Sequence, residues 1–260
     1  MKVQAFAKIN WDLHIAGKRA DGFHEIDSLM VSIGLADELD FSEAPSLSMT
    51  CSNPAIPVGG ENLVIKAARV MAAAAGRSAS YKIHLEKRIP QGGGLGGGSS
   101  DAAAVLMALN NLWSLGWSKE RLATLGAGLG SDVPFFLWGG WCRCRGRGEI
   151  VEPLEDAAAL GAARLLLLLP DLVVPTPAVY RALNAKAWDG QPAFRSLTQL
   201  SNEFSFLRSC LARLATQPRL SVAKSGTGSA LAENGLRAAA VTVEPRLAPL
   251  QALLAVRFPG

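Results

Sequence analysis

The sequence predicts an α/β protein that divides into two domains. Strand-like stretches alternate with amphipathic helical segments along the first half of the chain. A glycine-rich stretch at residues 91–98 runs directly into a helix-forming stretch. The composition changes near Glu152, because Pro153 and an alanine-rich segment follow it. We therefore expect one domain at residues 1–152 and a second at residues 153–260.

Length and composition restrict the class of protein. A chain of 260 residues with 49% hydrophobic and 18% charged residues is typical of a folded globular protein with a sizeable core. The net charge of +4 is modest, and no lysine- or arginine-rich block predicts a nucleic-acid partner. The first eight residues lack the apolar core of a signal peptide, and the longest apolar run, residues 165–169, is too short to span a membrane. Its four cysteines show no disulfide framework, so we expect a cytoplasmic protein with reduced thiols.

The spacing of apolar residues and the positions of glycines predict the elements before the glycine-rich stretch. Residues 3–15 and 27–35 are predicted to be strands. A helix opens at residues 61–64 and carries one apolar face until Gly76, which ends it. Residues 81–89 alternate between apolar and polar side chains, which is the pattern of a half-solvated antiparallel strand.

Further helices are expected after the glycine-rich stretch. Residues 102–113 place their bulky apolar side chains in one helical stripe, and residues 118–125 form a second helical pattern. Beyond the expected domain boundary, residues 165–169 are predicted to form a buried strand. A helix should begin at Tyr180, and another should cover residues 197–214.

The glycine-rich stretch predicts a phosphate-binding loop. Glycines fill six of the seven positions from Gly92 to Gly98, and without Cβ atoms they let a ligand approach the main chain closely. Ser99 or Ser100 is expected to cap the following helix, whose free N–H groups and dipole favour an anion. A flexible linker is disfavoured, because linkers seldom run into a capped amphipathic helix.

Two familiar nucleotide loops do not fit the neighbouring residues. A Walker A loop ends in Gly-Lys-Ser/Thr, whereas Gly98 is followed by two serines and Asp101. A dinucleotide fingerprint fits the glycine spacing, but it requires a continuously apolar strand before it, and residues 81–89 alternate. The helix expected at residues 118–125 also leaves no second strand to carry a ribose-binding acid.

Three segments resemble a known superfamily. The motif Pro-x-x-Gly-Gly-Leu-Gly-Gly-Gly-Ser-Ser-Asp at residues 90–101 resembles the second motif of the GHMP kinases, which phosphorylate small molecules such as homoserine and mevalonate. Ala-Lys-Ile-Asn at residues 7–10 and Gly-Lys-Arg-x-Asp-Gly-Phe-His-Glu-Ile at residues 17–26 resemble one family within it, the 4-diphosphocytidyl-2-C-methyl-D-erythritol kinases. The resemblance implies a two-domain GHMP fold. Its N-terminal ATP-binding domain would resemble domain 2 of ribosomal protein S5, and its C-terminal domain would be ferredoxin-like.

The resemblance implies that ATP, accompanied by Mg²⁺, phosphorylates the 2-hydroxyl of a cytidylylated methylerythritol in the non-mevalonate isoprenoid pathway. It places Asn62 and Lys87 near the adenine and the glycine loop against the phosphates. The residues that it assigns to ATP are Asn62, Lys87, Pro90, Gln91, Gly92, Gly93, Gly94, Leu95, Gly96, Gly97, Gly98, Ser99 and Ser100. The ligands of Mg²⁺ stay unknown. Asp101 and Ser100 are candidates by position only, and a role in the first helical turn explains both equally well.

The segment Gly-Ser-Asp-Val-Pro-Phe-Phe at residues 130–136 resembles the family motif that carries the catalytic base. By this resemblance, Asp132 would accept the proton of the attacking hydroxyl, and Lys8 would pair with Asp132 and orient the hydroxyl. Considered alone, Asp132 could be a helix cap and Lys8 a solvated strand lysine. Their occurrence together with the glycine loop favours a catalytic pair.

The resemblance also assigns the substrate side of the site. Phe23 and Tyr180 would stack on the cytosine ring, His24 would bond its edge, and Asn10 would contact the methylerythritol hydroxyls. Thr176 lies in a Val-Pro-Thr-Pro turn that resembles the family's substrate-side turn.

Three positions depart from the family pattern without removing a reacting group. Phe6 replaces a proline, Trp11-Asp12 replaces a more apolar pair, and Phe23 replaces a tyrosine. Residues 224–230 resemble the third GHMP motif, although a simple turn explains them equally well. The alternatives are another GHMP kinase, such as a homoserine kinase, and a nucleotide-binding relative that does not catalyse. The expected partners are small molecules, with neither nucleic acid nor membrane, and the oligomeric state stays open.

Overall fold

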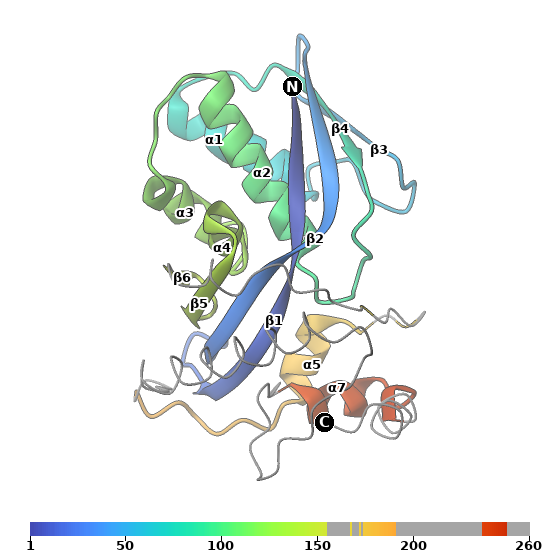
Figure 1. Cartoon of the computed structure of the whole chain (residues 1–260), viewed down its shortest axis with the longest axis vertical. Coiled ribbons are helices and arrows are strands. Elements are labelled where there is room, and N and C mark those ends of the chain that lie inside the picture. Colours follow the sequence, from blue (N-terminus) through green and yellow to red (C-terminus); the bar gives the residue numbers. More distant parts are fainter. Residues whose placement is uncertain (155–166, 168–171, 173, 191–235, 249–260) are drawn as a thin grey trace, which may run out of the picture. The chain divides into compact units, whose positions relative to one another are not determined.

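Two long neighbouring strands begin the chain, β1 (Lys2–Lys18) and β2 (His24–Glu43) (Figure 1). The computed structural model describes residues 1–154, 167, 172, 174–190 and 236–248. β1 is slightly longer than the predicted residues 3–15, whereas β2 extends eight residues past the predicted end at Leu35 because its buried positions continue to Phe41. β2 buries Ile26 near its start and Phe41 near its end.

The strands form one mixed sheet in the order β3-β4-β2-β5-β6, and β1 pairs with β2. The other strands are β3 (Ser48–Cys51), β4 (Tyr81–Glu86), β5 (Trp141–Gly146) and β6 (Ile150–Pro153). β4 runs antiparallel to β2, which confirms the strand direction predicted from its alternating pattern. Ile83 and Leu85 of β4 are almost completely buried, whereas Lys82 and His84 are exposed. β3 pairs with β4 in parallel, and β5 pairs with β6 in an antiparallel arrangement.

Four helices accompany this sheet: α1 (Leu63–Ala75), α2 (Gly97–Leu112), α3 (Lys119–Ala127) and α4 (Val133–Trp138). α2 packs against the other three, and its buried residues include Val105, Leu106 and Leu109. Gly76 ends α1 in the left-handed conformation with φ +61°, which confirms the predicted stop. The centre of this core therefore lies along α2, directly behind the glycine loop.

The predicted cap of α2 was wrong by one turn. The helix begins at Gly97, and Gly96 caps it in the left-handed conformation with φ +72°. The Ser100 hydroxyl donates to the carbonyl of Phe6 at 2.7 Å, so it joins α2 to β1 instead of capping the helix. Gly97 and Gly98 consequently belong to the first turn of the helix, where their N–H groups have no partner earlier in the helix.

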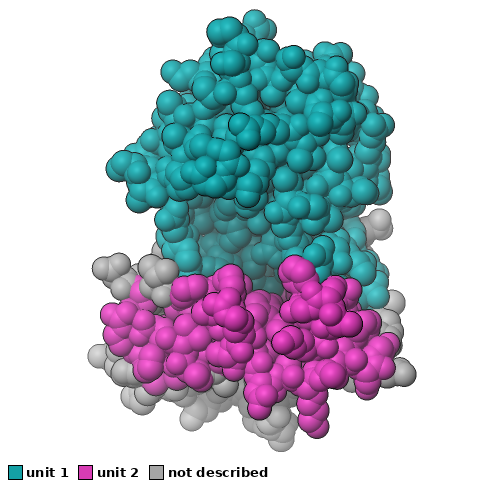
Figure 2. Space-filling view, turned by 180° about the vertical axis from the view of Figure 1, so that it is seen from behind, with its two compact units in different colours: residues 1–10, 29–153 teal, residues 11–28, 154–260 magenta. Residues whose placement is uncertain are grey.

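The chain separates into two units, which Figure 2 colours teal and magenta. Unit 1 contains Met1–Asn10 and Leu29–Pro153, and unit 2 contains Trp11–Ser28 and Leu154–Gly260. The later change of unit, after Pro153, lies beside the boundary proposed at Glu152. The segment Trp11–Ser28 belongs to unit 2, although no change in amino-acid composition marks this segment in the sequence.

Unit 2 has two described helices, α5 (Thr176–Ala182) and α7 (Arg237–Val243), which pack against each other. The end of β1 joins this unit through a parallel bridge between Lys18 and Ala187. Tyr180 lies inside α5, so this helix begins four residues earlier than predicted. The predicted strand at residues 165–169, apart from Leu167, the predicted helix at residues 197–214 and the stretch 224–230 lie outside the described residues.

Among the described residues, Cys51 and Cys142 are free thiols. Burial raises the pKa of Cys142 to about 12, so its thiol stays protonated at neutral pH. In the described part of the chain, every helix is too short or too polar to cross a membrane.

Candidate active site

The glycine loop packs closely against β1 near Lys8, in the middle of the strand. Gly92, Gly94 and Gly96 have φ values of +71°, +69° and +72°, which favour glycine over residues with a Cβ. The amide of Lys8 donates to the carbonyl of Leu95 at 3.0 Å and fixes the loop to β1. A Cβ on Gly96 would lie 2.6 Å from Cζ of Phe136 and 3.1 Å from Cγ of Lys8. The loop therefore needs glycine for its internal packing as well as for any ligand.

Lys8 and Asp132 form an ion pair beside this loop. The Lys8 Nζ lies 3.5 Å from Oδ2 of Asp132 and donates to Oδ1 of Asn10 at 2.5 Å. Lys8 and Asn10 are two residues apart in β1, so their side chains leave the same face of the strand. Only 7% of the Lys8 side chain is exposed, whereas 30% of the Asp132 side chain is exposed. The lysine is held within the fold, and the carboxylate remains accessible to a substrate.

Asp132 precedes α4, but its side chain makes no capping hydrogen bond to that helix. The simpler structural explanation, that Asp132 caps a helix, therefore finds no support. Val133 and Pro134 behind it are buried, so α4 fixes the backbone of Asp132 while its carboxylate turns to Lys8. The pair places a carboxylate, which can accept a proton, beside a cation, and general-base chemistry can use this arrangement.

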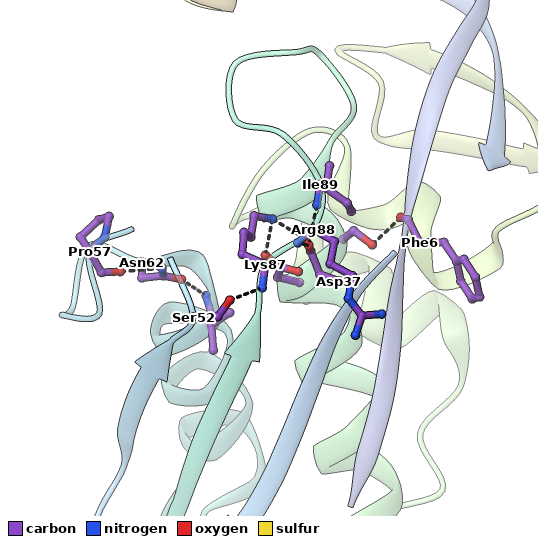
Figure 3. Close-up of polar contacts among 11 residues, drawn as sticks. Phe6, Asp37, Ser52, Pro57, Asn62, Lys87, Arg88 and Ile89 are labelled. Carbon is purple, nitrogen blue, oxygen red and sulfur yellow. Dashed lines mark hydrogen bonds and ion pairs between the residues drawn. The ribbon is translucent and has the colours of Figure 1, made fainter. Parts of the chain in front are cut away.

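A second charged cluster lies under the start of α2 and consists of Asp37, Lys87 and Asp101. The Lys87 ammonium bonds Oδ2 of Asp37 and lies 3.1 Å from Oδ2 of Asp101. Figure 3 shows Lys87 and Asp37 directed towards each other, with the amides of Arg88 and Ile89 on the same carboxylate. These amides donate to Oδ1 of Asp37 at 2.5 and 2.8 Å. Asp37 thus ties β2 to the segment that leads from β4 into the glycine loop.

Asp101 is the member of this cluster with one carboxylate oxygen that is unpartnered among the described residues. It is 3% exposed, and its Oδ1 has no hydrogen-bond partner in the described structure. Burial raises its pKa to about 7; the Lys87 charge opposes this rise, and the Asp37 charge adds to it. Two carboxylates share a single ammonium here, so protonation of Asp101 near neutral pH would leave the cluster uncharged.

The remaining residues predicted to bind ATP differ in accessibility. Residues 90–94 and Gly98 are exposed, Gly96, Gly97 and Ser99 are partly exposed, and Leu95 is buried. The side chain of Asn62 accepts from the Val64 amide at 2.9 Å and donates to the Pro57 carbonyl at 2.7 Å, as Figure 3 shows. The polar ends of Asn62 therefore hold the start of α1.

Unit 2 carries the residues predicted to bind the cytosine. The rings of His24 and Tyr180 are 5.1 Å apart between centroids and tilted by 36°. Phe23 is 47% exposed, Thr176 is exposed, and Tyr180 is partly exposed one helical turn after Thr176. The buried Nε2 of His24 has no hydrogen-bond partner among the described residues. Burial and, to a smaller extent, Lys18 lower the pKa of His24, so its imidazole is neutral at pH 7 and can both donate and accept.

The described residues do not fit a metal site built by the protein. Within the described ranges, no three His, Cys, Asp or Glu side chains gather as metal ligands. Lys87 lies against Asp101, and an ammonium at this distance repels a divalent cation. The Ser100 hydroxyl is buried and bonded to Phe6. Both positional candidates are thus engaged inside the fold, and we derive no step through Mg²⁺.

Asp37 is the member of the site that sequence reasoning missed. It lies in β2 on the same buried face as Leu39 and Phe41, because residues two apart in a strand share a face. The sequence did contain a signal for Asp37. A carboxylate stands there at an apolar position of an alternating strand, and a buried charge needs a partner. Its partner, Lys87, is 50 residues further along the chain, and no local pattern connects the two.

Comparison with known proteins identifies the family. The GHMP kinases N terminal domain matches residues 62–140. The 4-diphosphocytidyl-2-C-methyl-D-erythritol kinase of Pelotomaculum thermopropionicum is 46% identical over 74% of this chain and 68% of its own length. The enzyme of that name from a Synechococcus strain is 44% identical over 75% of this chain and 65% of its own length. The chain thus spans about two thirds of the length of these curated relatives.

Solved structures agree with this assignment. A crystal structure of 4-(cytidine 5'-diphospho)-2C-methyl-D-erythritol kinase superposes with a TM-score of 0.69 and 34% identity, over 98% of this chain and 83% of that one. The mevalonate kinase of Methanococcus jannaschii, with a TM-score of 0.50 and 11% identity over 84% of this chain and 73% of that one, shares the fold alone. The fold is that of the GHMP kinases, and the chain belongs to the family of 4-diphosphocytidyl-2-C-methyl-D-erythritol kinases.

Proposed function

We propose that the protein transfers the γ-phosphoryl group of ATP to the 2-hydroxyl of 4-diphosphocytidyl-2-C-methyl-D-erythritol. The observation that carries this proposal is the Lys8–Asp132 pair, held against the glycine loop by the Lys8–Leu95 backbone bond. A binding protein without catalysis has no need of this pair. The names of the relatives support the choice of phosphoryl acceptor, and the position of Asp132 beside Lys8 supports its role as the proton acceptor.

Asp132 would act as the general base. Its carboxylate takes the proton of the 2-hydroxyl while the oxygen attacks the γ-phosphorus, and the bond from the γ-phosphorus to the bridging oxygen of ADP breaks. The exposure of Asp132 allows that proton to pass to solvent afterwards. Lys8, fixed by Asn10 on one side, would hold the carboxylate in place and orient the attacking hydroxyl.

The glycine loop would hold the phosphates of ATP. Backbone N–H groups at the start of α2 and the positive end of its dipole suit an anion. Gly98 is exposed and would let phosphate oxygens approach the main chain. The described residues offer no carboxylate cage for Mg²⁺, so ATP would bring the ion on its own phosphates, where it neutralises negative charge.

The residues of unit 2 would recognise the cytosine. Phe23 offers an exposed aromatic face, and Tyr180 offers a second ring beside His24. The unpartnered Nε2 of His24 gains a hydrogen bond when a base edge reaches it. Stacking on an aromatic ring is worth about 1–3 kcal/mol per base, which is enough to select a cytidylylated acceptor over a bare polyol.

Release of ADP with three acceptors tests this proposal. The protein should turn over the diphosphocytidyl substrate and show little activity with homoserine or mevalonate, because neither carries a base for Phe23, His24 and Tyr180. Coupled spectrophotometric detection of ADP measures all three rates under the same conditions. Faster turnover of homoserine would favour another GHMP kinase, and no turnover of any acceptor would leave only nucleotide binding.

A further inference from the structure

The Asp37–Lys87–Asp101 cluster lies directly against the proposed phosphate loop. A Cβ placed on Gly97 would be 2.8 Å from the Lys87 Nζ, so the ammonium touches the first residue of α2. Asp101 belongs to the same helix and lies 3.1 Å from that ammonium through Oδ2. The lysine therefore contacts the start of α2 at both Gly97 and Asp101.

The cluster also fixes the entry into the loop. Asp37 accepts hydrogen bonds from the amides of Arg88 and Ile89, and these residues immediately precede Pro90 and the glycines. The Lys87 amide itself donates to Oγ of Ser52 at 2.9 Å. The Lys87 side chain is 7% exposed and bonded on two sides, so its ammonium is engaged within the fold.

Given the proposed ATP site, we propose that Asp37 and Lys87 are positioning residues for the phosphate loop, and that Asp101 takes up a proton when the triphosphate binds. The physical reason is charge. The cluster has two carboxylates and one ammonium, and Oδ1 of Asp101 has no partner in the described structure. A bound triphosphate adds negative charge at the same end of α2, which disfavours an ionised carboxylate behind the loop.

The pKa of Asp101 makes this coupling measurable near neutral pH. Burial raises it to about 7, with Lys87 and Asp37 as the charged groups that act on it. The charged residues of the helices packed on α2 are exposed: Lys66 and Arg69 on α1, and Lys119, Glu120 and Arg121 on α3. Asp132, before α4, is paired with Lys8. Asp101 is therefore the group next to the start of α2 that we expect to change its protonation near pH 7.

Calorimetric titration with ATP and excess Mg²⁺, without acceptor, tests this proposal. Repeating the titration in buffers of different ionisation enthalpy gives the number of protons taken up per ATP. If ATP raises the pKa of Asp101 by about one unit, the wild type takes up about half a proton at pH 7.5. Asp101→Asn should take up almost none. Asp40→Asn, an exposed carboxylate on the same strand as Asp37, should match the wild type.

Equal uptake by the wild type and Asp101→Asn would overturn the proposal, and so would zero uptake by the wild type. Failure of ATP to bind the wild type would instead contradict the proposed ATP site. A second test uses the wild type alone and so does not depend on the folding of a variant. The ATP affinity of the wild type should fall as the pH rises from about 6.5 to 8.5. An affinity that stays constant over this range would count against the coupling.

The positioning role has a kinetic signature of its own. Asp37→Asn places an amide donor against the Lys87 ammonium, so we expect it to raise KM for ATP more than it lowers kcat. KM for the cytidylylated acceptor should change little. A purely structural role for Asp37 would lower the amount of folded protein without this selective change in KM, and that result would contradict the assignment.

Discussion

Asp132→Asn should reduce kcat by roughly 10²–10⁴-fold while ATP affinity stays close to that of the wild type. The substitution preserves the size of the side chain but removes the proton acceptor for the attacking hydroxyl. Asp132 makes no capping hydrogen bond, and the glycine loop is fixed by the Lys8 amide and the Gly96 turn, so the ATP site has no structural need of this carboxylate. Steady-state turnover and calorimetric ATP binding measure the two effects separately.

Glu120→Gln is a suitable control, because Glu120 is an exposed carboxylate on α3. It should leave both kcat and ATP affinity unchanged. If Asp132→Asn kept most of its turnover, the base would have to be another group. If it lost ATP binding instead, Asp132 would belong to the nucleotide site.

Gly96→Ala should destabilise the fold and impair ATP binding together. Its φ of +72° costs a residue with a Cβ about 1–2 kcal/mol, and the new Cβ would lie 2.6 Å from Cζ of Phe136. The strain alone should lower Tm by about 2–8 °C in a chain of this size, and the clash adds to it. Any displacement of the loop also shifts the start of α2, where the N–H groups would meet phosphate oxygens. Thermal unfolding and KM for ATP check the two parts.

Gly98→Ala is the matched variant in the same loop. Its Cβ would lie 3.6 Å from Cδ1 of Leu63, which is ordinary van der Waals contact. We expect a Tm close to that of the wild type, together with weaker ATP binding if phosphate oxygens approach Gly98. A Tm for Gly96→Ala equal to that of Gly98→Ala would show that the positive φ and the contact with Phe136 impose no constraint.

Local patterns in the sequence predict several elements correctly. The alternation in residues 81–89 predicts an antiparallel strand, and β4, which ends at Glu86, pairs antiparallel with β2 and parallel with β3. Residues 118–125 show a helical pattern, and α3 covers Lys119–Ala127. Gly76 ends α1 as expected. These predictions succeed because each depends on a side-chain period or a single residue type, which tertiary contacts reinforce.

The features that local sequence patterns do not predict are contacts between distant segments of the chain. Ser100 has the residue type of a helix cap, but the Phe6 carbonyl of β1 takes its hydroxyl, and Gly96 caps α2 instead. The Asp37–Lys87 pair joins β2 to the entry of the glycine loop, across 50 residues. The Lys8–Asp132 pair is a correct prediction, since the structure shows it, but it came from the family resemblance and not from a local pattern. Contacts between distant segments determine all three of these interactions, and the helix and strand propensities of the residues do not predict them.

The position of the transferred phosphate tests the central proposal most directly. ATP and 4-diphosphocytidyl-2-C-methyl-D-erythritol should give, with this protein, one product that carries a new phosphomonoester on the 2-oxygen. Phosphorus NMR of the purified product would show one new monoester signal without a three-bond coupling to a proton, because the 2-carbon carries a methyl group and no hydrogen, beside the signals of the intact diphosphate. A phosphate on any other hydroxyl, or ADP formed without a phosphorylated acceptor, would contradict the proposed geometry of the Lys8–Asp132 site.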